Sequence, residues 1–200
     1  MTAKAPVNLK RHRYGDSQNV PIVTTVLLGL LLTPALADDL QGEALSRKIS
    51  ITGGYQILTI NKHWRVATIE EKSIHRSSKV VLNYDMGFIG TKVMPEKTCF
   101  VSLMDRKEIP TLDELPRLAE ESNQLQIQQQ AIKELTYVAR RPVRDLKSYG
   151  PDIFAMCRGL RTFVATEVHR PDFIVHQSSC IKVDVLQLFD LKYCRPDIKS

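Results

Sequence analysis

The chain has 200 residues, of which 43% are hydrophobic and 25% are charged, and its formal net charge is +6 at pH 7. This length supports one hydrophobic core of moderate size. The composition excludes a disordered protein and a collagen, and a single long apolar run excludes a membrane protein with several spans.

The apolar run, residues 22–37, follows a basic amino-terminal region and ends in Ala35-Leu36-Ala37. A basic region, an apolar region and small residues before the cleavage point are typical of a secretory signal. We therefore expect residues 1–37 to be a signal peptide, cleaved before Asp38, and the mature protein to be secreted and extracellular. The alternative is an uncleaved membrane anchor, because the leader before residue 22 is long.

Removal of residues 1–37 lowers the net charge from +6 to +3, because four basic groups and one acid leave with them. The remaining basic residues are interspersed with acids and form no stripe interleaved with aromatic side chains. Such a stripe is typical of nucleic-acid binding, so we expect no nucleic-acid partner.

Residues 49–104 have the pattern of an antiparallel meander. We expect residues 38–82, which include the first part of this meander, to form an amino-terminal β-rich segment. Alternating or β-branched runs predict strands at 57–61, 64–69, 79–84 and 99–104. Turn-forming residues separate them at 61–63 and 84–87.

The residues after the meander change to helical spacing. Thr111 as N-cap and Glu114 as its capping-box partner predict a helix that ends near Leu125, with a kink where Pro116 removes a hydrogen bond. The Gln-rich run at 124–130 then predicts a mobile crossing to about Tyr137.

A second helix is predicted at 143–157. Gly150-Pro151 cannot continue a regular helix, so we expect an interruption there.

The carboxy-terminal part, residues 159–200, contains a β-prone segment between two cysteines. Its apolar residues share one phase: Ile181, Val183, Val185, Phe189, Leu191 and Tyr193. A straight strand would hold the two ends about 45 Å apart, whereas disulfide-bonded Cα atoms lie within about 7 Å. A disulfide across this segment therefore requires a reversal, for which the segment offers no Gly, Pro or Asn.

The four cysteines, Cys99, Cys157, Cys180 and Cys194, all follow the predicted cleavage site. An even number in an oxidising compartment favours two disulfides and leaves no cysteine for a covalent partner. Three pairings are open, and the spacing favours Cys99 with Cys157 and Cys180 with Cys194 because closure of the short loop costs less entropy.

No motif points to catalysis or to a cofactor. The nucleophile elbow Gly-x-Ser-x-Gly, the zinc motif His-Glu-x-x-His and a phosphate-binding glycine loop are absent. His169 and His176 are seven residues apart, which matches no usual ligand spacing, so we expect no metal site.

Several motifs resemble the gastrokines, secreted gastric mucosal proteins built on a BRICHOS domain: Tyr84-x-x-Gly87-Phe88, Lys97-Thr98-Cys99-x-Val101, Met156-Cys157-Arg158-Gly159 and the interval from Cys180 to Cys194. The resemblance implies an α+β fold in which an antiparallel sheet is flanked by two helices. It also implies a BRICHOS core at 83–158 that a Cys99–Cys157 disulfide closes.

Asn83 departs from the family pattern, which has an aspartate at this position. If that aspartate controls a pH-dependent opening, the control is missing here or has moved to Asp85. The alternative is that Asp85 only forms a turn.

The resemblance implies a non-enzymatic protein that holds aggregation-prone β-segments, together with mucosal protection or growth restraint. Its expected partners are β-prone peptides, including its own segment 181–193, and mucosal proteins; a homo-oligomer is left open. The alternatives are a passive structural component of the mucus layer and a membrane-tethered proprotein.

Overall fold

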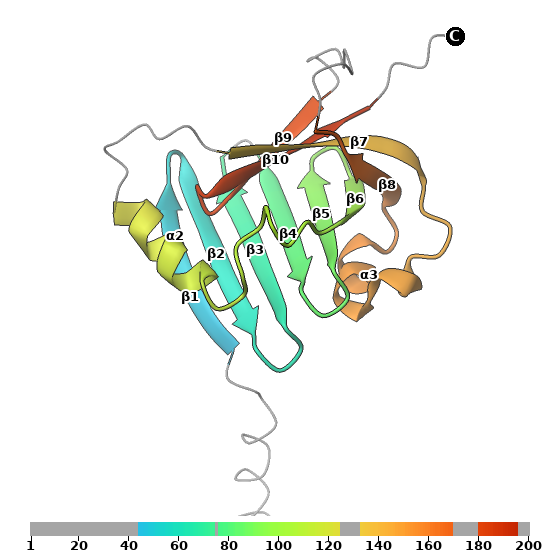
Figure 1. Cartoon of the computed structure of the whole chain (residues 1–200). Coiled ribbons are helices and arrows are strands. Elements are labelled where there is room, and N and C mark those ends of the chain that lie inside the picture. Colours follow the sequence, from blue (N-terminus) through green and yellow to red (C-terminus); the bar gives the residue numbers. More distant parts are fainter. Residues whose placement is uncertain (1–43, 75, 125–132, 170–179, 196–200) are drawn as a thin grey trace, which may run out of the picture. The chain divides into compact units, whose positions relative to one another are not determined.

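The structure is a computed structural model that describes residues 44–74, 76–124, 133–169 and 180–195. Its main feature is a sheet of ten strands in the order β1-β2-β3-β4-β5-β6-β8-β7-β10-β9 (Figure 1). The strands are β1 Ala44–Ile51, β2 Gly54–Asn61, β3 Val66–Ser73, β4 Ser77–Asn83, β5 Phe88–Met94, β6 Thr98–Leu103, β7 Lys133–Pro142, β8 Arg161–Glu167, β9 Cys180–Val185 and β10 Phe189–Cys194.

Strands β1 to β6 form an antiparallel meander. The predicted strands at 57–61, 64–69, 79–84 and 99–104 correspond to β2, β3, β4 and β6, whereas β1 and β5 were not predicted. Asn61 opens the β2–β3 turn, where its Oδ1 accepts a hydrogen bond from the backbone N–H of Trp64 at 3.0 Å. Asn83 opens the β4–β5 turn in the same way towards Met86 at 2.9 Å, and Gly87 supplies a φ of 74°. Both predicted turns are confirmed.

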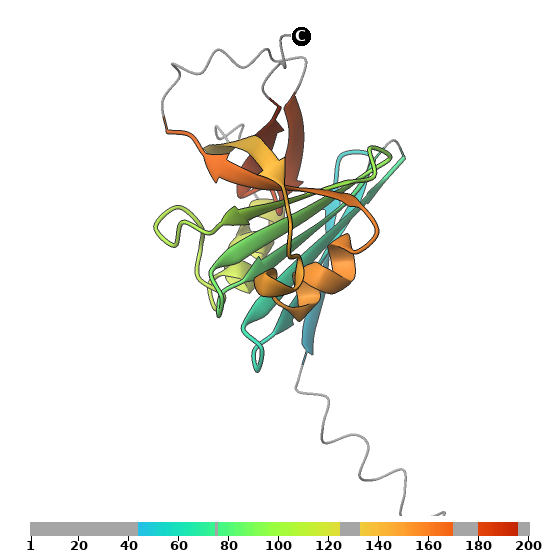
Figure 2. The same ribbon diagram turned by 90° about the vertical axis from the view of Figure 1, so that its right-hand side faces the viewer.

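The second half of the sheet mixes parallel and antiparallel pairs. Strand β8 pairs with β6 in parallel and β10 pairs with β7 in parallel, whereas β7–β8 and β9–β10 are antiparallel. The sheet curls, so that β9 and β10 cross one face of the meander (Figures 1 and 2). The predicted antiparallel sheet with two helices is therefore confirmed in part. The fold is mostly β, and the second half of its sheet is mixed, which corrects the predicted α+β class.

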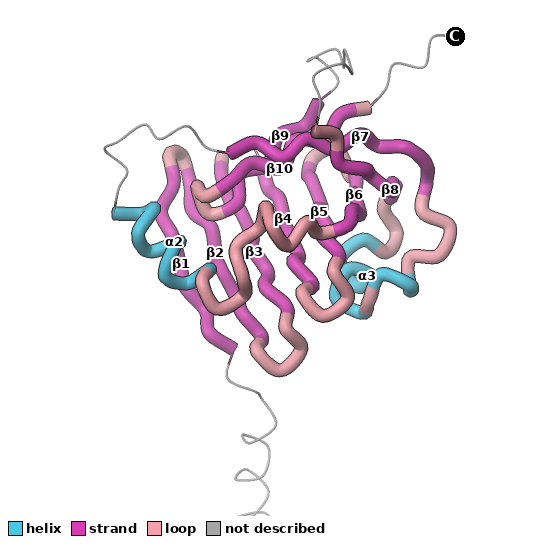
Figure 3. The backbone as a smooth tube through the Cα atoms, in the orientation of Figure 1, coloured by secondary structure: helices cyan, strands magenta, loops and turns pink. Residues whose placement is uncertain are grey.

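The α-helices α2 (Leu115–Gln124) and α3 (Pro151–Cys157) are short, as Figure 3 shows. Helix α2 begins four residues after Thr111, so Pro116 is in its first turn, where a backbone N–H has no intrahelical partner. The helix begins later than the predicted N-cap at Thr111 implies, so Pro116 removes no hydrogen bond from the interior of the helix. The capping-box contact does form, because the Glu114 carboxylate accepts a hydrogen bond from the Thr111 N–H at 3.0 Å.

The predicted second helix is also shorter than expected. A single 3₁₀ turn, η1 (Lys147–Tyr149), precedes α3, and Gly150 separates them with a φ of 97°. The interruption at Gly150-Pro151 is confirmed. The segment from 133 to 137, predicted as a mobile crossing, is instead the start of β7, while residues 125–132 of that crossing lie outside the described residues.

Two hydrophobic cores lie on opposite faces of the meander. The larger packs the inward side chains of β2 to β6 against α2, β7 and the β9–β10 hairpin. The smaller lies under α3, where Ile153 and Cys157 contact Val81 and Val101. Within the described residues no helix is long and apolar enough to cross a membrane. The predicted signal peptide lies outside them.

Candidate functional site

The predicted β-prone segment is the β9–β10 hairpin. The chain reverses at Leu186 and Gln187, which have φ values of 58° and 57°, and the Leu188 N–H donates to the Val185 carbonyl at 3.0 Å. Two successive central residues with positive φ are the arrangement of a type I′ turn, which normally uses Asn or Gly. This is the reversal that the sequence could not locate.

The hairpin is held as part of the sheet. Strand β10 pairs with β7 in parallel over six positions, from Phe189 opposite Lys133 to Cys194 opposite Val138. Of the six apolar residues on the predicted phase, Ile181 is partly buried and the other five are at most 2% exposed: Val183, Val185, Phe189, Leu191 and Tyr193. The phase predicted from the sequence therefore corresponds to the buried face.

Tyr193 anchors β10 against the meander. Its ring stacks on Phe100 of β6 at 4.4 Å and on Tyr137 of β7 at 5.4 Å between ring centroids. Its hydroxyl forms a hydrogen bond with Thr91 Oγ1 at 2.8 Å. Burial raises the pKa of Tyr193 to about 12, although the Thr91 hydrogen bond acts in the opposite direction, so the phenol stays neutral.

Gln56 of β2, in the opposite half of the sheet, forms hydrogen bonds with the hairpin turn, and we call this set of contacts the Gln56 clasp. Its Nε2 donates to Asp184 Oδ2 at 2.8 Å and to the Asp184 carbonyl at 3.1 Å, while its Oε1 accepts from the Leu186 N–H at 2.7 Å. Gln56 is fully buried. Because buried amides need partners, loss of these three contacts would leave polar groups of the turn without compensation.

Asp184 is the titratable group of this clasp. Burial raises its pKa to about 6, and the negative charges of Asp190 and Glu71 act in the same direction. Hydrogen bonds from the Gln187 N–H, at 3.2 Å, and from Gln56 favour the charged form and limit the shift.

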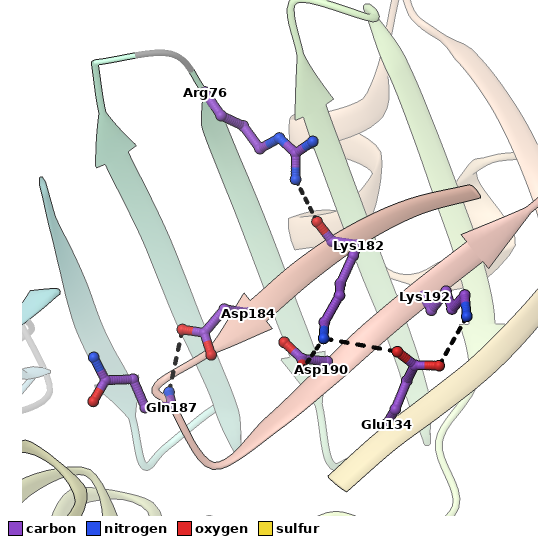
Figure 4. A network of polar contacts seen from close by, with 7 residues as sticks. All are labelled: Arg76, Glu134, Lys182, Asp184, Gln187, Asp190 and Lys192. Atoms are coloured by element: carbon purple, nitrogen blue, oxygen red, sulfur yellow. Dashed lines mark hydrogen bonds and ion pairs between the residues drawn. The ribbon is translucent and has the colours of Figure 1, made fainter. Parts of the chain in front are cut away.

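A chain of polar contacts follows the outer side of the hairpin (Figure 4). Arg76, before β4, donates through Nη1 to the Lys182 carbonyl at 2.5 Å. Lys182 Nζ pairs with Asp190 Oδ2 at 2.8 Å, and Glu134 of β7 pairs with Lys192 at 3.0 Å. These contacts compensate the buried Asp190 carboxylate and join the hairpin to both halves of the sheet.

The structure contains disulfides between Cys99 and Cys157 and between Cys180 and Cys194. The first joins β6 to the last residue of α3 inside the smaller core, with Cα atoms 5.7 Å apart. The second closes the open end of the hairpin, where the two residues are opposite each other in β9 and β10.

Asn83 ends β4 and is 4% exposed, whereas Asp85 is an exposed turn residue. Asn83 caps its own turn, where its Oδ1 accepts the hydrogen bond from the Met86 N–H. His169 lies beside Glu167, with Nδ1 and Oε1 3.6 Å apart, and His176 lies outside the described residues.

Sequence reasoning identified the hairpin segment and missed the residues that hold it. Gln56 shares the inward phase of β2 with Leu58 and Ile60, and a polar residue in that phase is the one local signal. Arg76 gave no signal, because its contact depends on how the sheet curls.

Comparison with known proteins shows the relatives of this chain. A family model for the BRICHOS domain matches residues 74–164. Gastrokine-1 of Sus scrofa is 30% identical over 179 residues, which cover 84% of this chain and 92% of that protein. Gastrokine-1 of Mus musculus is 28% identical, covering 87% and 95%, and Gastrokine-3 of Homo sapiens is 25% identical, covering 86% and 95%.

No solved structure matches the chain. The similarity to the gastrokines covers most of this chain and most of each relative, so it extends well beyond the BRICHOS match. The chain belongs to the gastrokine family.

Proposed function

We propose that this protein is a secreted mucosal protein whose BRICHOS domain holds β-prone segments and prevents their aggregation. Its partners are extended apolar peptides, with its own carboxy-terminal hairpin as the resident occupant, and proteins of the mucosa. Mucosal protection or growth restraint, which the family implies, would be a consequence of this holding activity. Gastrokine and BRICHOS proteins are not known as enzymes, which supports a binding role.

The hairpin is the observation that carries the proposal. It is a segment of high β-propensity and little net charge, a composition that aggregates when it is exposed. The domain buries its apolar face, pairs β10 with β7 and caps it with the Gln56 clasp. A surface that holds one such segment offers the same backbone pairing and apolar pockets to another, as in β-strand addition.

Fibril formation by a synthetic peptide rich in Val, Ile and Phe, followed by thioflavin fluorescence, tests this proposal. We expect the purified protein to lengthen the lag phase at substoichiometric concentration. Gln56→Ala should lengthen it further, because the hairpin then leaves the sheet more readily. Lys62→Ala, in the exposed β2–β3 turn, is the control and should behave as the wild type.

Failure of both the wild type and Gln56→Ala to delay fibrils, relative to an inert protein of equal mass, would contradict the proposal. It would favour the alternative of a passive structural component of the mucus layer. Amino-terminal sequencing of the secreted protein separates both from a membrane-tethered proprotein.

A further inference from the structure

A pocket of about 610 Å³ opens where β6 and β8 separate. The two strands pair as far as Ser102 opposite Ala165, after which β6 ends and β8 continues to Glu167 beside β7. Tyr149 of η1 closes one side and makes an edge-to-face contact with Phe88, with ring centroids 4.9 Å apart. Residues 180–195 do not line the pocket, so it is distinct from the hairpin site.

The wall of the pocket is apolar and partly open to solvent. Leu103 is 72% exposed although it ends a strand in the middle of the sheet, and it lies in the lining with Phe88, Tyr149 and Val164. Helix α3 covers the same face further along, where Val101 is fully buried. The volume is in the range of about 300–1,000 Å³ that binding pockets span, and a mostly apolar lining with a few polar groups is typical of them.

The rim of the pocket is acidic, in contrast to the net positive charge of the chain. Asp105 and Glu167 belong to the lining, and Glu108 is near enough to act on Glu167. The pKa of Glu167 is raised mainly by burial, and the like charges of Asp105 and Glu108 raise it further. The groups that act in the opposite direction are His169 and Lys133, and Lys133 is paired with Glu108.

We propose that this pocket binds a peptide in which a large apolar side chain is next to a lysine or arginine. Val164 and Glu167 lie on opposite faces of β8, because side chains alternate along a strand. The apolar side chain therefore lies against Leu103 and Val164, and the cation, on the next residue of an extended peptide, points to the other face towards Glu167 and Asp105, where it offsets the mutual repulsion of the carboxylates. In the described part of the chain, the pairing of β6 with β8 ends at Ser102 opposite Ala165, so Thr166 and Glu167 lie beyond it. The proposal places the backbone of an extended peptide beside these two residues. This site does not depend on the proposed holding activity of the hairpin site.

The probe is the capped tripeptide acetyl-Leu-Phe-Arg-amide, titrated into isotope-labelled protein and followed by NMR. Shifts should concentrate at residues 103–105 and 164–167. The matched peptide with Gln in place of Arg should bind about threefold to fivefold more weakly, the range of one partly exposed ion pair. Added salt should remove this difference.

Two variants divide the contributions of the wall and the rim. Glu167→Gln should abolish the preference for Arg over Gln, while Leu103→Ala should weaken both peptides about fivefold to tenfold by removing apolar contact area. Trp64→Ala removes another exposed large apolar side chain, 64% exposed in the β2–β3 turn, and Glu121→Gln removes an acid of α2; both controls should bind as the wild type.

Equal affinity for the Arg and Gln peptides would overturn the proposal, as would an unchanged affinity in Leu103→Ala. Shifts at residues other than the pocket lining, or no binding up to about 1 mM peptide, would also overturn it. The pocket lining and the hairpin share no residue. A failure of the peptide titration therefore leaves the expected result of the fibril assay unchanged.

Discussion

Replacement of Asp184 by Asn should make the hairpin insensitive to pH. The amide keeps an oxygen that accepts from Gln56 and from the Gln187 N–H, so the geometry of the clasp is retained. It cannot ionise, and it therefore removes the repulsion that the carboxylate experiences from Asp190 and Glu71.

The direction of the pKa shift of Asp184 determines whether stability rises or falls with pH. The pKa of Asp184 is about 6 in the folded protein, against 3.8 for a free side chain, so the folded state binds the proton more tightly. The stability that this protonated group contributes is full below about pH 4 and is lost as the pH rises through 6. A shift of about two pH units corresponds to at most about 3 kcal/mol in the free energy of unfolding.

Urea unfolding of the wild type and Asp184→Asn between pH 4 and pH 8 measures this effect. We expect Asp184→Asn to exceed the wild type by about 1–3 kcal/mol at pH 8 and by little at pH 4. Hydrogen exchange in residues 180–195, corrected for the intrinsic pH dependence, should show the same difference locally. A stability difference that is constant over this pH range would refute the reasoning.

Three further substitutions test the disulfides and the packing of α3 on the sheet. Cys99→Ser should reduce the secreted yield more than Cys180→Ser, because the disulfides span 58 and 14 residues, and the loop-entropy terms are about 4 and about 3 kcal/mol; equal yields would contradict this. Gly90→Ala should destabilise the protein by about 1–3 kcal/mol, since its Cβ would lie 2.9 Å from Ile153 Cγ1 and push α3 off the sheet; an unchanged urea midpoint would show that α3 moves freely.

The meander was predictable because its signals are local. Alternating apolar residues specify which face of each strand is buried, and Asn61, Asn83 and Gly87 supply the turns. Hairpins between neighbouring strands need no information from distant parts of the chain. The antiparallel order of β2, β3 and β4 follows directly, whereas β1 and β5 were not predicted.

The second half of the sheet depends on distant contacts. Leu186 and Gln187 adopt positive φ without Asn or Gly because Gln56, which is 130 residues from Leu186, binds the turn. Strand β7 was missed because its first residues follow a Gln-rich run that predicts a mobile crossing, and its last residues, Arg140-Arg141-Pro142, have no alternating apolar pattern. Its parallel partner β10 lies near the carboxy-terminal end of the chain. The spacing of residues along the sequence does not indicate which distant strands pair.

Asn83→Asp should create a second pH-dependent group, distinct from Asp184. The new carboxylate keeps the hydrogen bond from the Met86 N–H, but it takes the place of a side chain that is only 4% exposed and packs beside Gly150. Burial raises the pKa of a carboxyl group, so the variant should match the wild type near pH 4 and lose about 1–3 kcal/mol as the pH rises to neutral.

The wild type titrates in the same range through Asp184, so the clean comparison uses Asp184→Asn as the parent. In that background, Asn83→Asp should add a loss of stability with rising pH beyond that of the parent. A double variant whose stability profile matches that of the parent would mean that the carboxylate at position 83 is solvated or paired, and that it adds no pH-dependent group to this turn.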